Sequence, residues 1–300
     1  MTPRPLWNDT VFRVTSDSRW RAQYRLLQSW YRETVLNEPP DLGTNGRLVG
    51  NMLTAAAGAA GRNFLSTDIA AYVEKRIPEV QSANGTIEEK RLRQNMLSSQ
   101  PLCFNLFGHL RQHPLEAAAL LNRALGLEIA QVERIEVEWA PVEGIDDRTA
   151  FDAFVEYRTN SGELGFLGVE TKYTEPFSAT EYVSKIYTSV TESSGLFRAG
   201  AAEKLKGSTT NQLWRNTMLA LQARRGGFAK GHVVVVACKE DRTAKAAVRG
   251  VREQLFAPDD LVREVSLEGL VEHALKRPAL AEWANAFQRR YLDLRPVLTD

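Results

Sequence analysis

The sequence predicts an α/β protein in which a mixed β-sheet lies between helices. Residues 129–141 alternate apolar and charged side chains, which is the two-residue period of a strand with one buried face. Residues 232–238, HVVVVAC, are continuously apolar, which is typical of a strand buried on both faces. Between them, residues 208–225 have the spacing of an amphipathic helix.

The N-terminal part of the chain has mainly helical patterns. Residues 18–36 space large apolar side chains at helical intervals, and residues 37–46, NEPPDLGTNG, predict a loop. A second helix is expected near residues 67–77, because Pro78 follows and disfavours its continuation. A polar helix is expected at residues 87–97.

From Pro101 onward the pattern changes. A helix that begins there should end at His113, because the residue before a proline disfavours helical backbone. Pro114 suits the first position of the next helix, and Gly126 suits its end. The turn TNSGE, residues 159–163, joins two strands as a hairpin. The expected order is a helix at 114–126, strands at 129–141, 149–158 and 164–172, a helix at 208–225, strands at 232–238 and near 261–266, and helices near 267–276 and 279–292.

These patterns divide the chain into two regions. Residues 1–100 form a mainly helical N-terminal extension, and residues 101–300 form the α/β domain. Residues 174–207 directly follow a predicted strand and are interpreted as an insertion in that domain.

The composition is that of a globular protein, with 43% hydrophobic and 25% charged residues in 300. Since no apolar stretch approaches the roughly 20 residues that span a bilayer, we expect no membrane association. The first residues have no apolar signal core, so we expect a cytoplasmic protein. Cys103 and Cys238 lie in apolar surroundings and are expected to be buried reduced thiols.

Charge is distributed unevenly although the net charge is only +1. Residues 128–156 contain nine acidic and two basic side chains, whereas residues 197–230 contain seven basic and one acidic. Such a pair of patches would suit cation binding beside a polyanion. Solvated faces of helices produce the same asymmetry, so both interpretations stay open.

Two acidic residues lie on the predicted hairpin. Asp152 and Glu170 are each nine residues from Ser161, so a hairpin centred on Ser161 places them opposite one another. Lys172 shares the face of Glu170 because side chains two residues apart on a strand point the same way. Two opposed carboxylates repel each other unless a cation lies between them. The pattern therefore predicts a Mg²⁺ site made by Asp152, Glu170, the Thr171 carbonyl and waters, with Lys172 orienting or helping to deprotonate an attacking water.

A surface ladder of salt bridges is the structural alternative. With 25% charged residues, a Glu-x-Lys triplet is expected about once per chain by chance. The chain has such a second triplet in Glu88-Glu89-Lys90, which lies in a polar helical segment without a partner acid. The triplet at Glu170 is more specific, because it ends an apolar strand whose hairpin partner has an acid.

The segments FDAFVEYR, residues 151–158, and GFLGVETKY, residues 165–173, resemble the acid-bearing strand and the E-x-K strand of the PD-(D/E)XK nuclease superfamily. The order of elements over residues 114–238 is similar to the restriction-endonuclease-like core of that superfamily, helix, three strands, helix and strand. SSQPLCFNLFGHL and NQLWRN further resemble a bacterial restriction-endonuclease family within it. The resemblance implies that Asp152, Glu170 and Lys172 are catalytic. Phe151 stands where the superfamily usually has proline.

Further candidates come from the helix at residues 208–225. Gln212, Arg215 and Asn216 share one face, so Gln212 is a candidate to position water or phosphate and Arg215 to bind the substrate backbone. Hydrogen bonding within the fold is an equally good interpretation.

Several other polar residues rank lower. Glu116 is favourable in the first turn of its helix for electrostatic reasons, and an acid on this helix in some nucleases of the class makes it an outside candidate. Asp146 and Asp147 precede the strand that contains Asp152 and are expected in a loop. His109 and His113 have zinc-like spacing, but no nearby acid or cysteine completes a zinc site.

The function predicted is Mg²⁺-dependent hydrolysis of DNA phosphodiester bonds, with Mn²⁺ as a substitute metal. An endonuclease of restriction or defence is implied by the resemblance alone. Two alternatives stay open: a catalytically inactive module that binds DNA or protein, and a nuclease acting on RNA or branched DNA. A homodimer is compatible with cutting both strands. The chain has no G-x-x-x-x-G-K-[ST] loop that would bind ATP.

Overall fold

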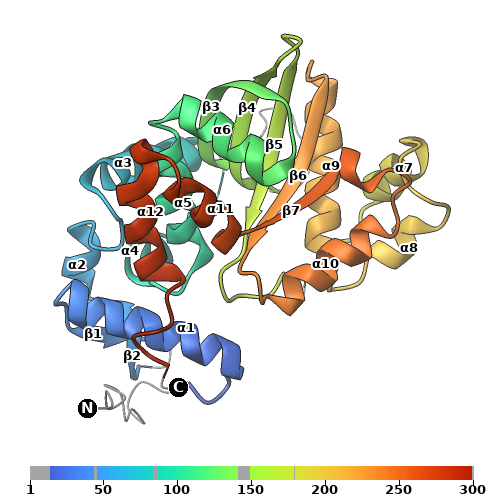
Figure 1. The fold of residues 1–300 in the computed structure, drawn as a ribbon. Coiled ribbons are helices and arrows are strands. Elements are labelled where there is room, and N and C mark those ends of the chain that lie inside the picture. Colours follow the sequence, from blue (N-terminus) through green and yellow to red (C-terminus); the bar gives the residue numbers. More distant parts are fainter. Residues whose placement is uncertain are drawn as a thin grey trace.

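The computed structural model in Figure 1 describes residues 14–43, 46–83, 85, 87–140, 149–178 and 180–298. A five-stranded sheet lies at its centre, in the order β3-β4-β5-β6-β7. The first three strands pair antiparallel, and β5-β6 and β6-β7 pair parallel, so the predicted mixed sheet is confirmed. The strands are β3 (Ile129–Trp139), β4 (Phe151–Thr159), β5 (Leu164–Thr171), β6 (Lys230–Ala237) and β7 (Val262–Ser266).

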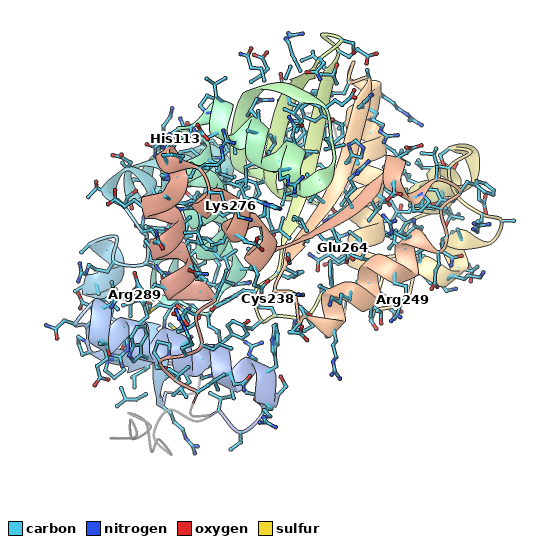
Figure 2. The ribbon with its side chains drawn as sticks, viewed as in Figure 1. His113, Cys238, Arg249, Glu264, Lys276 and Arg289 are labelled. Carbon is cyan, nitrogen blue, oxygen red and sulfur yellow. The ribbon has the colours of Figure 1, made fainter. Side chains whose placement is uncertain are left out.

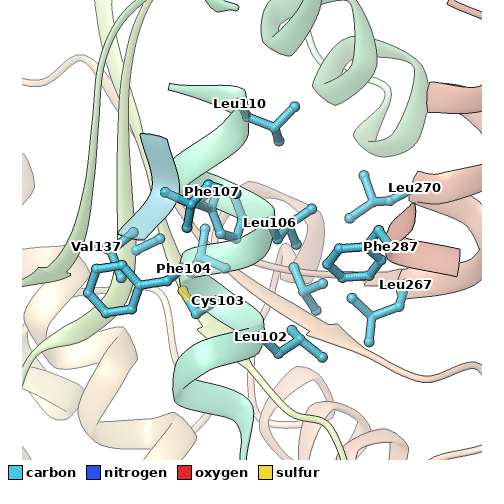
Figure 3. Packing of buried hydrophobic residues seen from close by; sticks show 14 of the residues in the cluster. Leu102, Cys103, Phe104, Leu106, Phe107, Leu110, Val137, Leu267, Leu270 and Phe287 are labelled. Atoms are coloured by element: carbon cyan, nitrogen blue, oxygen red, sulfur yellow. The ribbon is translucent and has the colours of Figure 1, made fainter. Parts of the chain in front are cut away.

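Helices cover both faces of the sheet (Figure 1). One apolar cluster fills the space between the sheet and α5, α6, α11 and α12, and a second fills the space between the sheet and α9 and α10. Figure 3 shows the first cluster, in which Leu106 of α5 points toward Phe287 of α12 and Phe104 points to the other side of α5, beside Val137 of β3. The bounds are α5 (Ser99–Leu110), α6 (Pro114–Leu125), α9 (Asn211–Arg225), α10 (Arg242–Arg252), α11 (Leu267–Leu275) and α12 (Pro278–Tyr291).

The N-terminal region contains helices and one small β-ribbon. The predicted loop at residues 37–46 includes strand β1, which pairs antiparallel with β2, so that prediction was incomplete. The helix expected to end before Pro78 continues to Ser82. Ile77 and Val80 in that turn are buried, and their packing outweighs the hydrogen bond that the proline removes. The elements are α1 (Arg19–Trp30), a π-helix (Tyr31–Val35), β1 (Pro40–Leu42), β2 (Leu48–Leu53), α2 (Ala55–Ala59), α3 (Thr67–Ser82) and α4 (Glu89–Gln94).

The N-terminal region packs directly against the chain that follows β5. Gln28 of α1 donates a hydrogen bond to the Tyr173 hydroxyl at 2.9 Å, and Tyr24 contacts the same ring edge-on at 5.2 Å between ring centres. Both tyrosines belong to the first apolar cluster, which joins residues from before and after residue 100.

Residues 174–207 contain two short helices on the α9 side of the sheet, α7 (Lys185–Ser193) and α8 (Ala201–Leu205) (Figure 1). Tyr187 and Leu205 belong to the second apolar cluster, so this segment packs against the domain. Cys103 and Cys238 are both buried and unpaired with each other (Figure 2 labels Cys238). Within the described residues, no helix combines the length and the apolar character needed to cross a bilayer.

Candidate active site

The candidate site lies where β4 begins and β5 ends. The antiparallel register pairs Ala153 with Val169, and one further step along it places Asp152 opposite Glu170. β5 has strands on both sides and is buried from Gly165 to Thr171, so Glu170 ends an interior strand. The sequence-based register of the hairpin is therefore confirmed.

Glu170 and Lys172 form an ion pair that is almost fully buried. The Lys172 ammonium nitrogen lies 2.8 Å from Oε1 of Glu170, and the two residues are 7% and 2% exposed. Their packing on the α9 side of the sheet excludes the surface ladder of salt bridges as an explanation of this pair. The predicted common face of Glu170 and Lys172 is thus present.

Helix α9 supplies two amides to Glu170. Gln212 donates from Nε2 to Oε1 of Glu170 at 2.6 Å, and Asn216 donates from Nδ2 to Oε2 at 2.7 Å. The Gln212 carbonyl oxygen accepts from Lys172 at 3.4 Å and from the Ser178 amide at 2.8 Å. The carboxylate is held from both sides, and Asn216, which the sequence analysis placed on this face without a role, contacts it directly.

Asp152 is held by the residue after Glu170. Its Oδ2 accepts from the Thr171 amide at 2.7 Å and from the Thr171 hydroxyl at 2.8 Å. Cys103 of α5 donates its thiol to the Asp152 carbonyl oxygen at 3.3 Å, which ties the strand to the helix behind it. Thr171 thus has a positioning contact in addition to the carbonyl that was expected to bind metal.

Burial and like charge act together on the acids. Burial raises the pKa of Asp152 well above its usual range, and the charges of Glu170 and Glu138 raise it further. Burial opposes the charged form of Lys172, but Glu170 and Asp152 raise its pKa above the usual value. The site therefore brings together acids whose charged forms disfavour one another, and one ammonium group offsets this only in part.

Glu138 is an acid of this site that the sequence analysis did not single out. The register of Val137 with Ala153 places Glu138 beside Asp152, so Glu138, Asp152 and Glu170 follow one another across three strands. Burial, with Glu170 contributing, raises the pKa of Glu138 to about 7. Gln100 of α5 donates to its Oε1 at 2.7 Å. The alternating pattern of β3 indicated a strand that ends near Glu138, but its place beside Asp152 depends on the pairing of β3 with β4.

The carboxylates of Glu138, Asp152 and Glu170 do not surround one common position for a metal ion. Within the residues that the structure describes, no group of three or more His, Cys, Asp or Glu side chains is arranged to hold a metal ion. Asp152 and Glu170 are accordingly the pair to which a metal site is assigned below.

A second ion pair supports the chain that leaves the site. Arg91 of α4 lies 2.8 Å from Oε1 of Glu175, and the Ser99 amide at the start of α5 donates to the same oxygen at 2.7 Å. Burial would raise the pKa of Glu175, but the Ser99 amide and Arg91 lower it below its usual value. The N-terminal region therefore contributes Arg91, a cation that pairs with Glu175 three residues after Lys172.

Arg215 lies beside the Glu170 cluster and contacts other partners. It donates to the Thr149 hydroxyl at 2.5 Å, and its guanidinium carbon lies 4.2 Å from the centre of the Tyr182 ring. Tyr182 is 49% exposed in the 174–207 segment, and its backbone bonds to Asn211 at the start of α9. Arg215 and Tyr182 thus form a stacked pair at the surface next to the buried acids.

The remaining candidates lie elsewhere. Glu116 of α6 forms an ion pair with Arg277, the residue before α12. His109 stacks on Trp283, with ring centres 4.8 Å apart, and lies beside His113. Asp146 and Asp147 lie outside the described residues.

The acidic segment at residues 128–156 is only in part a negatively charged surface, because arginines pair with several of its acids. Arg134 bonds to Glu136 and Glu156, and Arg158 bonds to Glu133, so a ladder of ion pairs covers this part of β3 and β4. The exposed triplet Glu88-Glu89-Lys90 lies at the start of α4, where Glu89 pairs with Arg93. Glu138 and Asp152 are the acids of the segment that lie at the candidate site.

Comparison with known families agrees with this geometry. The family model of the PD-(D/E)XK nuclease superfamily matches residues 15–293, and the chain therefore belongs to that superfamily. The match includes most of the N-terminal region, for which the resemblance had given no support. Neither the curated proteins nor the solved structures include a match to this chain. The family supports a nuclease-type function that uses divalent metal ions.

Proposed function

We propose that the protein is a Mg²⁺-dependent endonuclease that hydrolyses phosphodiester bonds in DNA. The observation that supports this most is the buried pair of Glu170 and Lys172, held by Gln212 at the end of a strand whose hairpin partner has Asp152. A structural ion pair does not need a second carboxylate beside it, since the added like charge opposes burial. A divalent cation would remove that opposition.

The residues present fit a hard cation with oxygen ligands. Asp152 and Glu170 would hold the metal, together with the Thr171 carbonyl and waters. Bound there, Mg²⁺ would polarise a phosphoryl oxygen and stabilise the charge that develops on it; Mn²⁺ would substitute. Asn216 and the Thr171 hydroxyl fix the two carboxylates, so little reorientation is needed when a cation enters.

Lys172 acts on the attacking water in this mechanism, and Gln212 holds Lys172 and Glu170 in place. The Lys172 ammonium group has three donors, and Glu170 and Gln212 hold it in one orientation. It would hydrogen bond the water or the phosphate oxygen and place the attacking atom. The Gln212 amide lies within hydrogen-bond distance of both Glu170 and Lys172. It therefore fixes the position of the carboxylate relative to the ammonium group.

The 174–207 segment is the proposed DNA-facing element. It follows the catalytic strand directly, and Tyr182, Val183 and Ile186 expose large apolar surfaces on it. The stacked Arg215 next to Tyr182 supplies a positive group that suits a backbone phosphate. A role in restriction or defence, cytoplasmic localisation, assembly as a homodimer and the division of the chain at residue 100 are retained as proposals.

Cleavage of supercoiled plasmid and linear DNA with Mg²⁺ or Mn²⁺ tests the function. Asp152→Ala and Lys172→Ala should abolish cutting, and EDTA should abolish it in the unmodified protein. Glu88→Gln and Lys90→Ala in the exposed comparison triplet are matched controls that should leave activity unchanged. Circular dichroism and thermal unfolding establish that each variant is folded. Full activity in both site variants would defeat the assignment, and metal-independent DNA binding without cutting would favour the inactive module.

A further inference from the structure

A polar cavity of about 430 Å³ lies at the other end of the sheet from Asp152. Tyr157, five residues further along β4, lines it, which places the cavity roughly 16 Å from the hairpin acids at the usual rise of a strand. The cavity is bounded by the segment after α6, by the starts of β6 and β7 and by the end of α9. It shares no lining residue with the candidate active site.

Three side chains on the α6 face of the sheet form the floor. Tyr157 of β4 belongs to the first apolar cluster. His232 of β6 and Arg263 of β7 lie on the same face of the sheet, because each is two residues before a valine, Val234 or Val265, that packs in this cluster. Gly165 on β5 lets the Tyr157 ring lie directly over the backbone, because a Cβ there would lie 2.5 Å from that ring. The floor is therefore polar at a place where neighbouring positions on these strands are apolar.

Cations surround this floor. Arg224 donates to the carbonyl oxygens of Gly231 and Asp260, and Arg263 donates to that of Leu125 at 2.6 Å. Carbonyl oxygens hold the guanidinium groups in place, and exposed Asp260 also interacts electrostatically with Arg224. Lys230 lines the cavity at its exposed rim. Two acids, Glu128 and Asp260, also line the cavity, and both are exposed.

Two buried polar atoms on the floor have no hydrogen-bond partner among the residues that the structure describes. They are Nδ1 of His232, a residue only 5% exposed, and Nε of Arg263. Burial, together with the charges of Arg263, Arg224 and Lys230, lowers the pKa of His232 to about 4. The side chain is thus neutral at pH 7 in a positive field. A buried polar atom without a hydrogen-bond partner is unfavourable, and a ligand that bonds to it would remove that penalty.

We propose that this cavity binds the phosphate group of a small phosphorylated molecule of mononucleotide size. Guanidinium groups fixed by carbonyl oxygens present their remaining donors to a tetrahedral anion, and a phosphate monoester has nearly two negative charges for the three cations. A neutral imidazole can donate from Nδ1 to a third phosphate oxygen. The volume lies in the range of ordinary ligand pockets of about 300–1,000 Å³ and exceeds what an inorganic anion needs. The inference does not depend on the proposed nuclease function.

Isothermal titration calorimetry with AMP, inorganic phosphate and adenosine tests the proposal at fixed ionic strength. AMP should bind, adenosine should not, and Arg263→Gln and His232→Phe should each weaken AMP binding at least tenfold. Lys230→Gln, on the exposed rim, should weaken it severalfold without affecting folding. Arg249→Gln, on exposed α10 (Figure 2), is the control and should bind as the unmodified protein does. Failure of AMP to bind, or binding that all three pocket variants retain, would overturn the proposal. Binding of inorganic phosphate without AMP would overturn the mononucleotide assignment.

Discussion

The ammonium group of Lys172 lies 2.8 Å from Oε1 of Glu170, with both residues buried at the end of an interior strand. A buried ion pair by itself adds little net stability, because desolvation offsets most of the attraction. Its position beside Asp152, with Gln212 and Asn216 bonded to the same carboxylate, gives it a role that stability alone does not explain. This relationship leads to the first two predictions.

Lys172→Met should destabilise the fold by about 3–5 kcal/mol, because it leaves the Glu170 charge buried without its cation. Glu170→Gln together with Lys172→Met should be less destabilised than the sum of the two single variants, since neither charge is then left alone. Urea unfolding of all four proteins at pH 7.5 measures the coupling. Strict additivity would mean that the two groups do not interact.

Asn216→Ala should lower the rate of DNA cleavage by at least about tenfold while leaving DNA affinity unchanged, because it frees one oxygen of Glu170 to move. Loss of one bond to a charged acceptor should also destabilise the fold by about 1.5–3 kcal/mol. Asn285→Ala, on the exposed face of α12, is the matched control. A cleavage rate equal to that of the control would remove Asn216 from the site.

Arg215→Ala should weaken DNA binding in EDTA and reduce the salt dependence by about one phosphate contact, a change of roughly 0.9 in the log–log slope. The reason is its position beside exposed Tyr182, where a guanidinium group can reach a backbone phosphate. Fluorescence anisotropy across a salt series gives the slope. Arg249→Ala should leave it unchanged, and an unchanged slope in Arg215→Ala would contradict the substrate-binding role.

Stability should fall in acid partly through His109. Burial first, and then His113, lower the pKa of His109 to about 4 in the folded protein, whereas an unfolded chain has a value near 6.5. The unfolded state therefore binds the proton first, and folding stability decreases as the pH falls from about 6.5 to 4. His109→Phe keeps the stacking on Trp283 and should lose less stability over this window, by on the order of 1 kcal/mol after allowance for partial exposure. Parallel curves of unfolding free energy against pH for the two proteins would refute this.

The hairpin was predictable from sequence because its chemistry is local. A turn centred on Ser161 and a period of two residues fix which side chains face each other, so Asp152, Glu170 and Lys172 could be grouped before any coordinates. Asn216 and Gln212 could be placed on one helix face, but their contact with Glu170 depends on how α9 packs, which is a tertiary property. The position of Glu138 beside Asp152 could not be predicted without knowing the order of the strands in the sheet.

The other differences have separate causes. Helix α10 was not predicted, although Asp241 caps it and Ala244, Ala247, Val248 and Val251 repeat at helical spacing, so its signal was present. Pro78 was given too much weight as a stop, because packing of the buried turn around it offsets one missing hydrogen bond. The contact of Arg91 with Glu175 joins positions 84 residues apart and could not come from periodicity.

Anomalous diffraction from crystals soaked in Mn²⁺ tests the central claim most directly. The account predicts a peak between Asp152 and Glu170, about 2–2.3 Å from one oxygen of each carboxylate, that disappears in Asp152→Ala crystals. Crystals of the unmodified protein that show no peak there, or the same peak in the variant, would contradict a metal-dependent nuclease centre at this hairpin.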